Sequence, residues 1–292
     1  MTSVGAISEI EALPHGSLLK RKAAEKAVLA PALSAYEAFV KIASGLKVKD
    51  NTSVISLVDA FNAYRRFAIP IFEAGKNVPQ ENLRSTMMEE LYTWLFKDIF
   101  ELLGADQPMN FRLGKSTSSY VSLTFSPHSF ESIFGDPNPR IAKKDQDFAI
   151  GASFQLTITP DGGGDTIDSG ILIPIVAIEC KTYLAKNHLD MCASTAASIK
   201  NAAPYCMYIV SAEFIKMDKG VFPELTDISE IFVLCRAKNG DRKKRREAGL
   251  PPHDIYADLV CDLFNRVIGH LRSIWWDPES ALKSGRVIQR PF

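Results

Sequence analysis

The chain has 292 residues, of which 46% are hydrophobic and 23% are charged, and its formal net charge at pH 7 is zero. This composition predicts a globular protein with one large domain or two small ones, and it excludes an intrinsically disordered chain. The neutral balance argues against binding nucleic acid through overall charge, so any DNA-binding surface has to be a local patch.

The first third of the chain is predicted to be helical. Residues 18–45, rich in Ala, Lys, Leu and Glu, indicate two helices separated by a proline, and residues 52–74 indicate another helix that ends near Pro70. The strongest helical pattern lies in 82–103, where apolar residues recur at helical spacing: Met88, Leu91, Leu95, Ile99 and Leu102. Gly104 is in the right place to end that helix.

The pattern changes to that of strands after residue 110. Short alternating or apolar runs predict strands at 118–125, 146–159, 171–181, 205–212 and 229–236. The second and third of these are separated by a glycine-rich turn at 160–165, and helices are predicted at 188–201 and about 254–275. This order predicts an α/β fold whose sheet follows a helical N-terminal region.

The cysteines and the apolar runs predict a cytoplasmic protein that does not enter a membrane. The five cysteines are odd in number and none is in a Cys-x-x-Cys spacing, which is typical of free thiols in a reducing compartment. Residues 1–14 are mixed and acidic, without the apolar centre of a signal peptide. The longest apolar run, 171–178, is too short to span a bilayer.

The most informative residues are Asp147, Glu179 and Lys181. Glu179-Cys180-Lys181 closes the apolar strand at 171–181, and the period of two in a strand puts Glu179 and Lys181 on the same face. A Glu-x-Lys by itself is common at exposed strand ends. Here it follows an apolar strand, and an Asp-bearing strand precedes it across a glycine-rich turn. Two carboxylates and a lysine so arranged predict a divalent-metal site that attacks a phosphodiester with water.

Two segments around these residues carry a family resemblance. Residues 144–151 and 178–184 resemble the PD-(D/E)xK nuclease superfamily, and more specifically type II restriction endonucleases similar to the subunits of asymmetric, heterodimeric BbvCI-like enzymes. The resemblance is specific over 144–190. It implies a restriction-endonuclease-like central mixed sheet flanked by helices, with an endonuclease domain at 81–292 after a helical N-terminal region at 1–80. Gln146 stands where the superfamily often has proline, a position that varies among active members.

The resemblance also implies roles for individual residues. Asp147, Glu179 and the main-chain carbonyl of Cys180 would bind Mg²⁺, which prefers hard oxygen ligands. Lys181 would orient or help to deprotonate the attacking water and stabilise charge that develops on the phosphorus. Hydrolysis would leave a 5′-phosphate and a 3′-hydroxyl.

Two positions of the site remain open from the sequence. Asp145 has the same strand parity as Asp147, although Asp147 directly precedes the apolar residues of its strand and is preferred for that reason. A further catalytic carboxylate is expected from the helix at 82–103. Glu89 and Glu90 lie on either side of its apolar stripe, so helical geometry does not choose between them, and both can also be ordinary exposed glutamates.

A basic run after the last predicted strand is the candidate DNA-binding surface. It consists of Arg242, Lys243, Lys244, Arg245 and Arg246. Charge runs are usually solvated surface, but beside a nuclease site phosphate contacts with DNA are favoured. Gly114-Lys115-Ser116 lacks the earlier glycine of a phosphate-binding loop, since position 109 is methionine, so nucleotide binding there is rejected. Lys115 remains a candidate for a contact with the DNA backbone.

The predicted partners follow from the resemblance and from the geometry of cleavage. The substrate is double-stranded DNA, and a cognate DNA methyltransferase would belong to the same system without direct contact. One active site cuts one strand, so a double-strand cut needs a homodimer or a related second subunit. The alternatives are a non-catalytic or nicking DNA-binding subunit and a DNA repair or junction nuclease of the same superfamily. The presence of Asp147, Glu179 and Lys181 argues against a non-catalytic chain.

Overall fold

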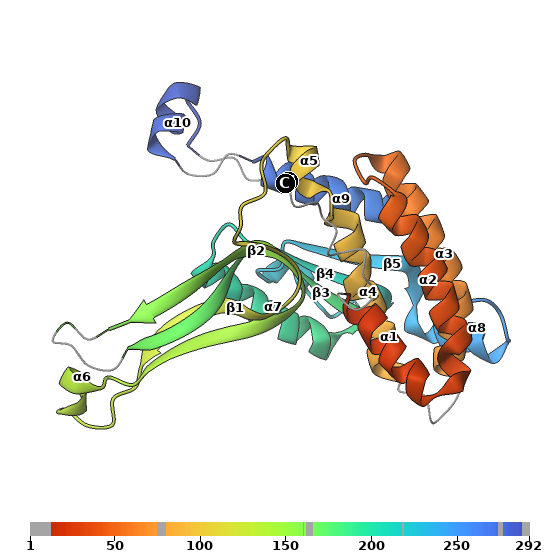
Figure 1. The fold of residues 1–292 in the computed structure, drawn as a ribbon, viewed down its shortest axis with the longest axis horizontal. Helices are drawn as coiled ribbons and strands as arrows, with labels where there is room; N and C mark the ends of the chain where they lie inside the picture. Colours follow the sequence, from red (N-terminus) through yellow and green to blue (C-terminus); the bar gives the residue numbers. More distant parts are fainter. Residues whose placement is uncertain are drawn as a thin grey trace.

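The first part of the structure is a layer of helices. The computed structural model describes residues 13–74, 80–159, 161, 166–217, 219–273 and 277–287. Up to residue 104 the described elements are α1 (Pro14–Glu25), the short 3-10 helix η3 (Ala27–Leu29), α2 (Ala30–Gly45), α3 (Asn51–Glu73), α4 (Gln80–Phe96) and α5 (Ile99–Leu103). Figure 1 shows α1, α2 and α3 grouped together at one side of the sheet, with α4 between them and the strands.

A mixed sheet forms the centre of the described chain. Its five strands are β1 (Phe111–Phe125), β2 (Pro139–Ile158), β3 (Ile167–Ala185), β4 (Met207–Lys216) and β5 (Glu230–Lys238). They lie in the order β1-β2-β3-β4-β5, with antiparallel pairing from β1 to β3 and parallel pairing from β3 to β5. The predicted fold class, a central mixed sheet flanked by helices after a helical N-terminal region, is therefore confirmed. Most of the predicted turn at 160–165 lies outside the described residues.

The remaining helices lie against the sheet or at the ends of its strands. They are α6 (Ser132–Gly135), α7 (Lys186–Ala202), the 3-10 helix η4 (Pro223–Leu225), α8 (Asn239–Glu247), α9 (Ala257–Leu271) and α10 (Pro278–Ser284). The long strands β1, β2 and β3 extend together beyond the helices, and α6 lies at the far end of this extension (Figure 1). The body of the molecule, with both sheet faces covered, is therefore at the other end of these strands.

Two apolar clusters fill the space on the two sheet faces. The larger joins α1–α4 and α9 to one face, through residues such as Phe148, Ile178 and Ile209. The smaller packs α7 against the other face, through residues such as Ala177 and Val210. Because the larger cluster runs from the first helices to the sheet without a break, the described residues before 80 share a core with those after it. The boundary near residue 80 stays a prediction.

Two of the predicted helices need comment. Helix α3 matches the predicted range 52–74, but Pro70 lies inside it and does not end it, because Phe72 beyond the proline is buried and holds the last turn against the core. The helix predicted at 82–103 is divided at Asp98 into α4 and α5. Gly104 does end the second of these, with the positive φ of 66° that glycine adopts without steric cost.

One apolar stretch in the described chain is long enough to cross a membrane by length and composition, namely Ala27–Gly45. In the structure its helix α2 packs on α3, and Tyr36, Phe39 and Ala43 are buried in the larger core cluster. This packing accounts for the apolar side of α2. The five cysteines are free, as predicted, and all of them are buried.

Candidate active site

The candidate site lies where β2 and β3 separate. Their antiparallel ladder begins at the pair Phe148↔Ile178, one residue beyond Asp147 on β2 and one residue before Glu179 on β3. The carboxylate of Asp147 accepts a hydrogen bond of 2.8 Å from the main-chain N–H of Cys180. The side chain of Asp147 therefore accepts the hydrogen bond that a main-chain carbonyl of β2 would accept if the two strands continued to pair. Asp147 and Glu179 are both held at the point where the strands separate.

A bulge in β3, with Ile175 as its extra residue, shapes this junction. The register between β2 and β3 shifts between Ile150 and Gly151. A Cβ atom on Gly151 would lie 2.3 Å from the carbonyl oxygen of Ile173, so only glycine allows the two strands to approach this closely.

Alternation along β3 separates structural from polar residues. Ile178 and Cys180 are buried in the larger core cluster, on the face covered by α3 and α4. Glu179 and Lys181, at the alternate positions, are half-buried, and their side chains form an ion pair. Lys181 thus stands beside the carboxylates, as the two-residue spacing predicts.

A third carboxylate reaches the site from α4. The side chain of Glu89 is buried, and it accepts a hydrogen bond of 3.0 Å from Nζ of Lys115 on β1. Burial raises the pKa of Glu89, and the negative charge of Asp147 raises it further, while Lys115 acts in the opposite direction. The pKa of Glu179 is raised by the same two causes, burial and then Asp147, against the effect of Lys181. We call Glu89, Asp147, Glu179, Lys115 and Lys181 the carboxylate–lysine cluster.

Glu90, the other candidate on α4, lies in a different environment. Its carboxylate accepts hydrogen bonds from the main-chain N–H groups of His15 and Gly16, both at 3.0 Å, and from Nε1 of Trp94 and the hydroxyl of Tyr36. Burial raises the pKa of Glu90 to about 7, although these hydrogen bonds oppose the shift. Glu90 therefore binds the start of α1 and the side of α2, and Glu89 alone takes part in the carboxylate–lysine cluster.

The carboxylate–lysine cluster has the donor chemistry for a hard cation. The charge of Asp147 raises the pKa of both Glu89 and Glu179, so the three carboxylates lie near one another, and oxygen donors of this kind suit Mg²⁺ or Mn²⁺. They do not form a closed cage, because no group of three His, Cys, Asp or Glu side chains in the described residues is arranged to hold an ion. The expected set of two carboxylates and one main-chain carbonyl does not require such a cage, so the residues present fit a divalent cation.

The basic run forms helix α8 directly after β5. Lys243 and Lys244 are exposed, whereas Arg242 and Arg246 pair with Glu73 of α3 at 2.7 and 3.9 Å. Arg245 donates to the main-chain oxygen of Pro251. Helix α8 contacts β4 and β5, not the strands that carry Asp147 and Glu179. Only part of the run is therefore presented to solvent as a basic surface.

Sequence reasoning missed a buried ion cluster behind the site. Glu213 on β4 is enclosed by Arg65 of α3 and by Arg84 of α4, which donates to its two oxygens at 2.9 and 3.0 Å. The available signal was a glutamate in the middle of an otherwise apolar strand, between Ala212 and Phe214. Such a residue needs a buried partner of opposite charge.

Comparison with known proteins decides the family. The family model described as Bpu10I restriction endonuclease matches residues 80–286, which is most of the chain. The chain belongs to the Bpu10I restriction endonuclease family. No curated protein matches significantly. A solved structure described as the native BbvCI A2B2 tetramer at low resolution matches with a TM-score of 0.61 and 19% identity, over 89% of this chain and 94% of that chain. At this identity the likeness shows a common fold.

Membership in the Bpu10I family gives the carboxylate–lysine cluster its context. Every residue of the cluster, and the whole of α8, lies inside the matched range. Helices α1–α3 precede that range. The resemblance to restriction enzymes that the sequence motif indicates is thus confirmed, and a family of restriction endonucleases implies a nuclease.

Proposed function

We propose that this chain is a Mg²⁺-dependent, sequence-specific endonuclease for double-stranded DNA, a type II restriction enzyme or one subunit of it. The observation that carries the proposal is the carboxylate–lysine cluster at the divergence of β2 and β3, in a chain of the Bpu10I family. The products are a 5′-phosphate and a 3′-hydroxyl.

Each residue of the cluster has a task in this proposal. Asp147, Glu179 and the main-chain carbonyl of Cys180 bind the cation, which when bound supplies Lewis-acid stabilisation of the phosphate and a more acidic water. Lys181 orients the attacking water and offsets charge on the phosphate oxygens, a role suited to an ammonium that already lies against Glu179. Glu89 supports the same site from α4, held in place by Lys115. Glu90 has no task in the chemistry.

Lys243 and Lys244 supply phosphate contacts outside the active site. Both are exposed on α8, and phosphate contacts position a protein on DNA without reading its sequence. Arg242, Arg245 and Arg246 contribute less to such contacts, because their side chains are already engaged by Glu73 and Pro251.

A second catalytic chain is needed for a double-strand cut. The similar BbvCI structure is an A2B2 tetramer, which supports a related second subunit over a homodimer. We expect the enzyme to act in the cytoplasm, together with a cognate DNA methyltransferase that it does not contact. The endonuclease domain spans residues 81–292, and residues 1–80 are its helical N-terminal extension.

The experiment is an incubation of the purified chain with supercoiled plasmid, with Mg²⁺ or with EDTA, beside the variant Lys181→Ala. We expect the wild-type chain to cleave the plasmid only with Mg²⁺. The cleavage rate of the variant should be lower by a factor of about 100 to 1000, the usual effect of removing one group that stabilises the transition state. Discrete linear fragments indicate a homodimer, and nicked circles indicate one half of a heterodimer. Cleavage by Lys181→Ala at the wild-type rate contradicts the proposal.

A further inference from the structure

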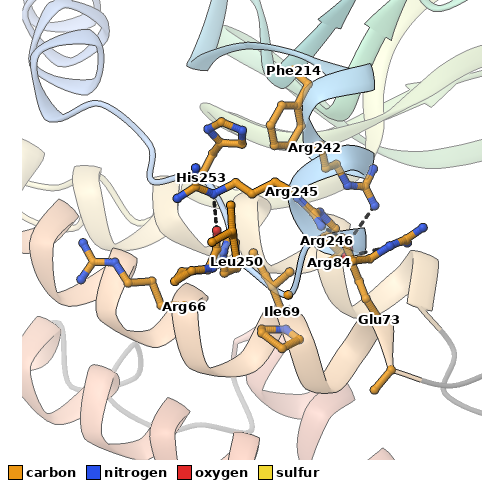
Figure 2. Close-up of a pocket in the computed structure, with 15 residues that line it drawn as sticks. Arg66, Ile69, Glu73, Arg84, Phe214, Arg242, Arg245, Arg246, Leu250 and His253 are labelled. Atoms are coloured by element: carbon orange, nitrogen blue, oxygen red, sulfur yellow. Dashed lines mark hydrogen bonds and ion pairs between the residues drawn. The ribbon is translucent and has the colours of Figure 1, made fainter.

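A cavity separate from the carboxylate–lysine cluster lies among α3, the start of α4, the end of β4 and the segment after α8. Its volume is about 470 Å³. Cavities of roughly 300–1,000 Å³ are typical of sites for small organic ligands. Figure 2 shows that side chains from different elements line the same space: Ile69 from α3, Phe214 from β4 and Leu250 from the segment after α8.

Arginines surround this cavity. They are Arg66, Arg84, Arg242, Arg245 and Arg246, with Glu73 as the carboxylate among the lining residues (Figure 2). Three of them come from α8 with the spacing i, i+3, i+4, which puts them on one side of the helix. The basic run is therefore divided by helical geometry: three arginines face the cavity, and Lys243 and Lys244, absent from its lining, face solvent.

The charges around the cavity are not balanced by carboxylates. Glu73 is shared by Arg84, Arg242 and Arg246, so its charge is already offset, and Arg84 also pairs with the buried Glu213. Arg66 pairs with Asp254. Arg245 has no carboxylate within ion-pair distance among the described residues, and it donates only to the main-chain oxygen of Pro251. Arg245 is therefore the arginine of this cavity that is left to bind an anionic group, and arginine is the side chain best suited to bind phosphate.

The wall of the cavity is mostly apolar and partly aromatic. The guanidinium groups of Arg84 and Arg242 lie 5.8 and 5.9 Å from the centre of the Phe214 ring. The ring of His253 meets Phe214 edge to face at 5.7 Å. Nε2 of His253 is buried without a hydrogen-bond partner in the described part of the chain. A ligand that fits this wall has a planar ring with polar atoms at its edge.

We propose that this cavity binds a nucleotide. Its phosphate lies against Arg245 and Arg246, and its base packs against Leu250 and Pro251, with a polar edge atom at Nε2 of His253. This inference does not depend on the proposed cleavage chemistry, since none of these residues belongs to the carboxylate–lysine cluster. The same ligand chemistry has two sources, a free mononucleotide and an unpaired nucleotide in a DNA strand.

The test is calorimetric titration of the full chain in EDTA with dAMP, inorganic phosphate and deoxyadenosine. We expect dAMP to bind at least about tenfold more tightly than either fragment, because it uses the arginines and the apolar wall together. Arg245→Gln should weaken dAMP binding by about tenfold or more, the effect of losing one charge-assisted contact. Lys244→Gln, the same change on the other side of α8, should bind dAMP within about twofold of wild type.

Competition identifies the source of the nucleotide. The dAMP complex of Lys181→Ala is challenged with a DNA duplex that carries one bulged nucleotide and with the fully paired duplex. Displacement by the bulged duplex alone assigns the cavity to a nucleotide of DNA, and displacement by neither assigns it to a free nucleotide. The Lys181→Ala variant also separates the two proposals, because dAMP binding should survive in a chain that no longer cuts.

Three results overturn the nucleotide assignment. The first is no dAMP binding by wild type at millimolar concentration. The second is binding of inorganic phosphate as tight as that of dAMP, which leaves a simple anion site. The third is equal weakening by Arg245→Gln and Lys244→Gln, which shows general charge attraction. Circular dichroism of Arg245→Gln confirms that the variant is folded, as expected for an arginine with only one main-chain contact.

Discussion

Two clusters of charged residues lie close together in this fold, and they shift the pKa values of their carboxylates in opposite directions. Burial by itself raises the pKa of Glu213, but Arg84 and Arg65 outweigh it and bring that pKa down to about 2. In the carboxylate–lysine cluster the pKa values of Glu89 and Glu179 are raised, by burial and then by Asp147, in spite of two nearby lysines. The first cluster is balanced and holds α3 and α4 to the sheet. In the second cluster the negative charge is not fully compensated, which is typical of a binding or catalytic site.

The largest expected effect comes from removing a carboxylate from the unbalanced cluster. Asp147→Asn should lower the rate of DNA cleavage by about 1000-fold, since the cation loses a charged ligand worth several kcal/mol. The free energy of unfolding should change by less than about 1 kcal/mol, because the amide oxygen still accepts the N–H of Cys180. Cleavage rates and urea unfolding measure the two quantities. A variant that cuts normally, or one that unfolds, breaks the comparison.

The matching change in the balanced cluster should affect folding instead. Glu213→Gln leaves Arg65 and Arg84 buried without their shared anion, which should lower the free energy of unfolding by about 3–5 kcal/mol. Chemical denaturation measures this loss. The control Glu37→Gln, at an exposed position on α2, should stay within about 0.5 kcal/mol of wild type. Equal stability of the two variants would show that the Glu213 cluster does not hold the helices to the sheet.

Glu90 gives a smaller effect that depends on pH. Its folded pKa of about 7 lies above the ordinary value of 4.5, so the native state keeps a proton that the unfolded chain releases. The resulting stabilisation is present below pH 4.5 and is lost as the pH rises through 7, a change of about 3 kcal/mol. Glu90→Gln cannot ionise and should lack this loss. The difference in unfolding free energy between wild type and variant, measured from pH 4.5 to 8, tests it; a constant difference would contradict the assignment.

The smallest expected effect concerns the solvent side of α8. Lys244→Gln should weaken DNA binding a few-fold for every sequence, and it should reduce the slope of log K against log salt by about one. Fluorescence anisotropy over a range of salt concentrations measures this. An unchanged slope would remove Lys244 from the DNA-contacting surface and would leave α8 with its cavity-facing arginines alone.

The sequence predicted the class of fold and the strands of the site because both depend on local patterns. Alternating or continuous apolar runs mark β2 and β3, and the Glu-x-Lys spacing alone puts Glu179 and Lys181 on one face. The family resemblance rests on the same residues, and the family model confirms it.

The choice between adjacent glutamates could not be made from the sequence, because it depends on tertiary packing. Glu89 and Glu90 have similar positions relative to the helix stripe, and only the arrival of Lys115 from β1 and of His15 from α1 distinguishes them. The division of α8 into two sides likewise required the position of Glu73 on α3. Pro70 lies inside α3 and does not end it, because burial of Phe72 outweighs the loss of one hydrogen bond.

The most direct test of the account is a calorimetric titration of the chain with Mn²⁺ at neutral pH, in wild type, Asp147→Asn and Glu90→Gln. We expect wild type and Glu90→Gln to bind the cation alike, because Glu90 faces α1 and α2, and Asp147→Asn to bind it at least about tenfold more weakly. Equal binding by wild type and Asp147→Asn, or no binding by wild type at millimolar Mn²⁺, would contradict the claim that the divergence of β2 and β3 is a cation site.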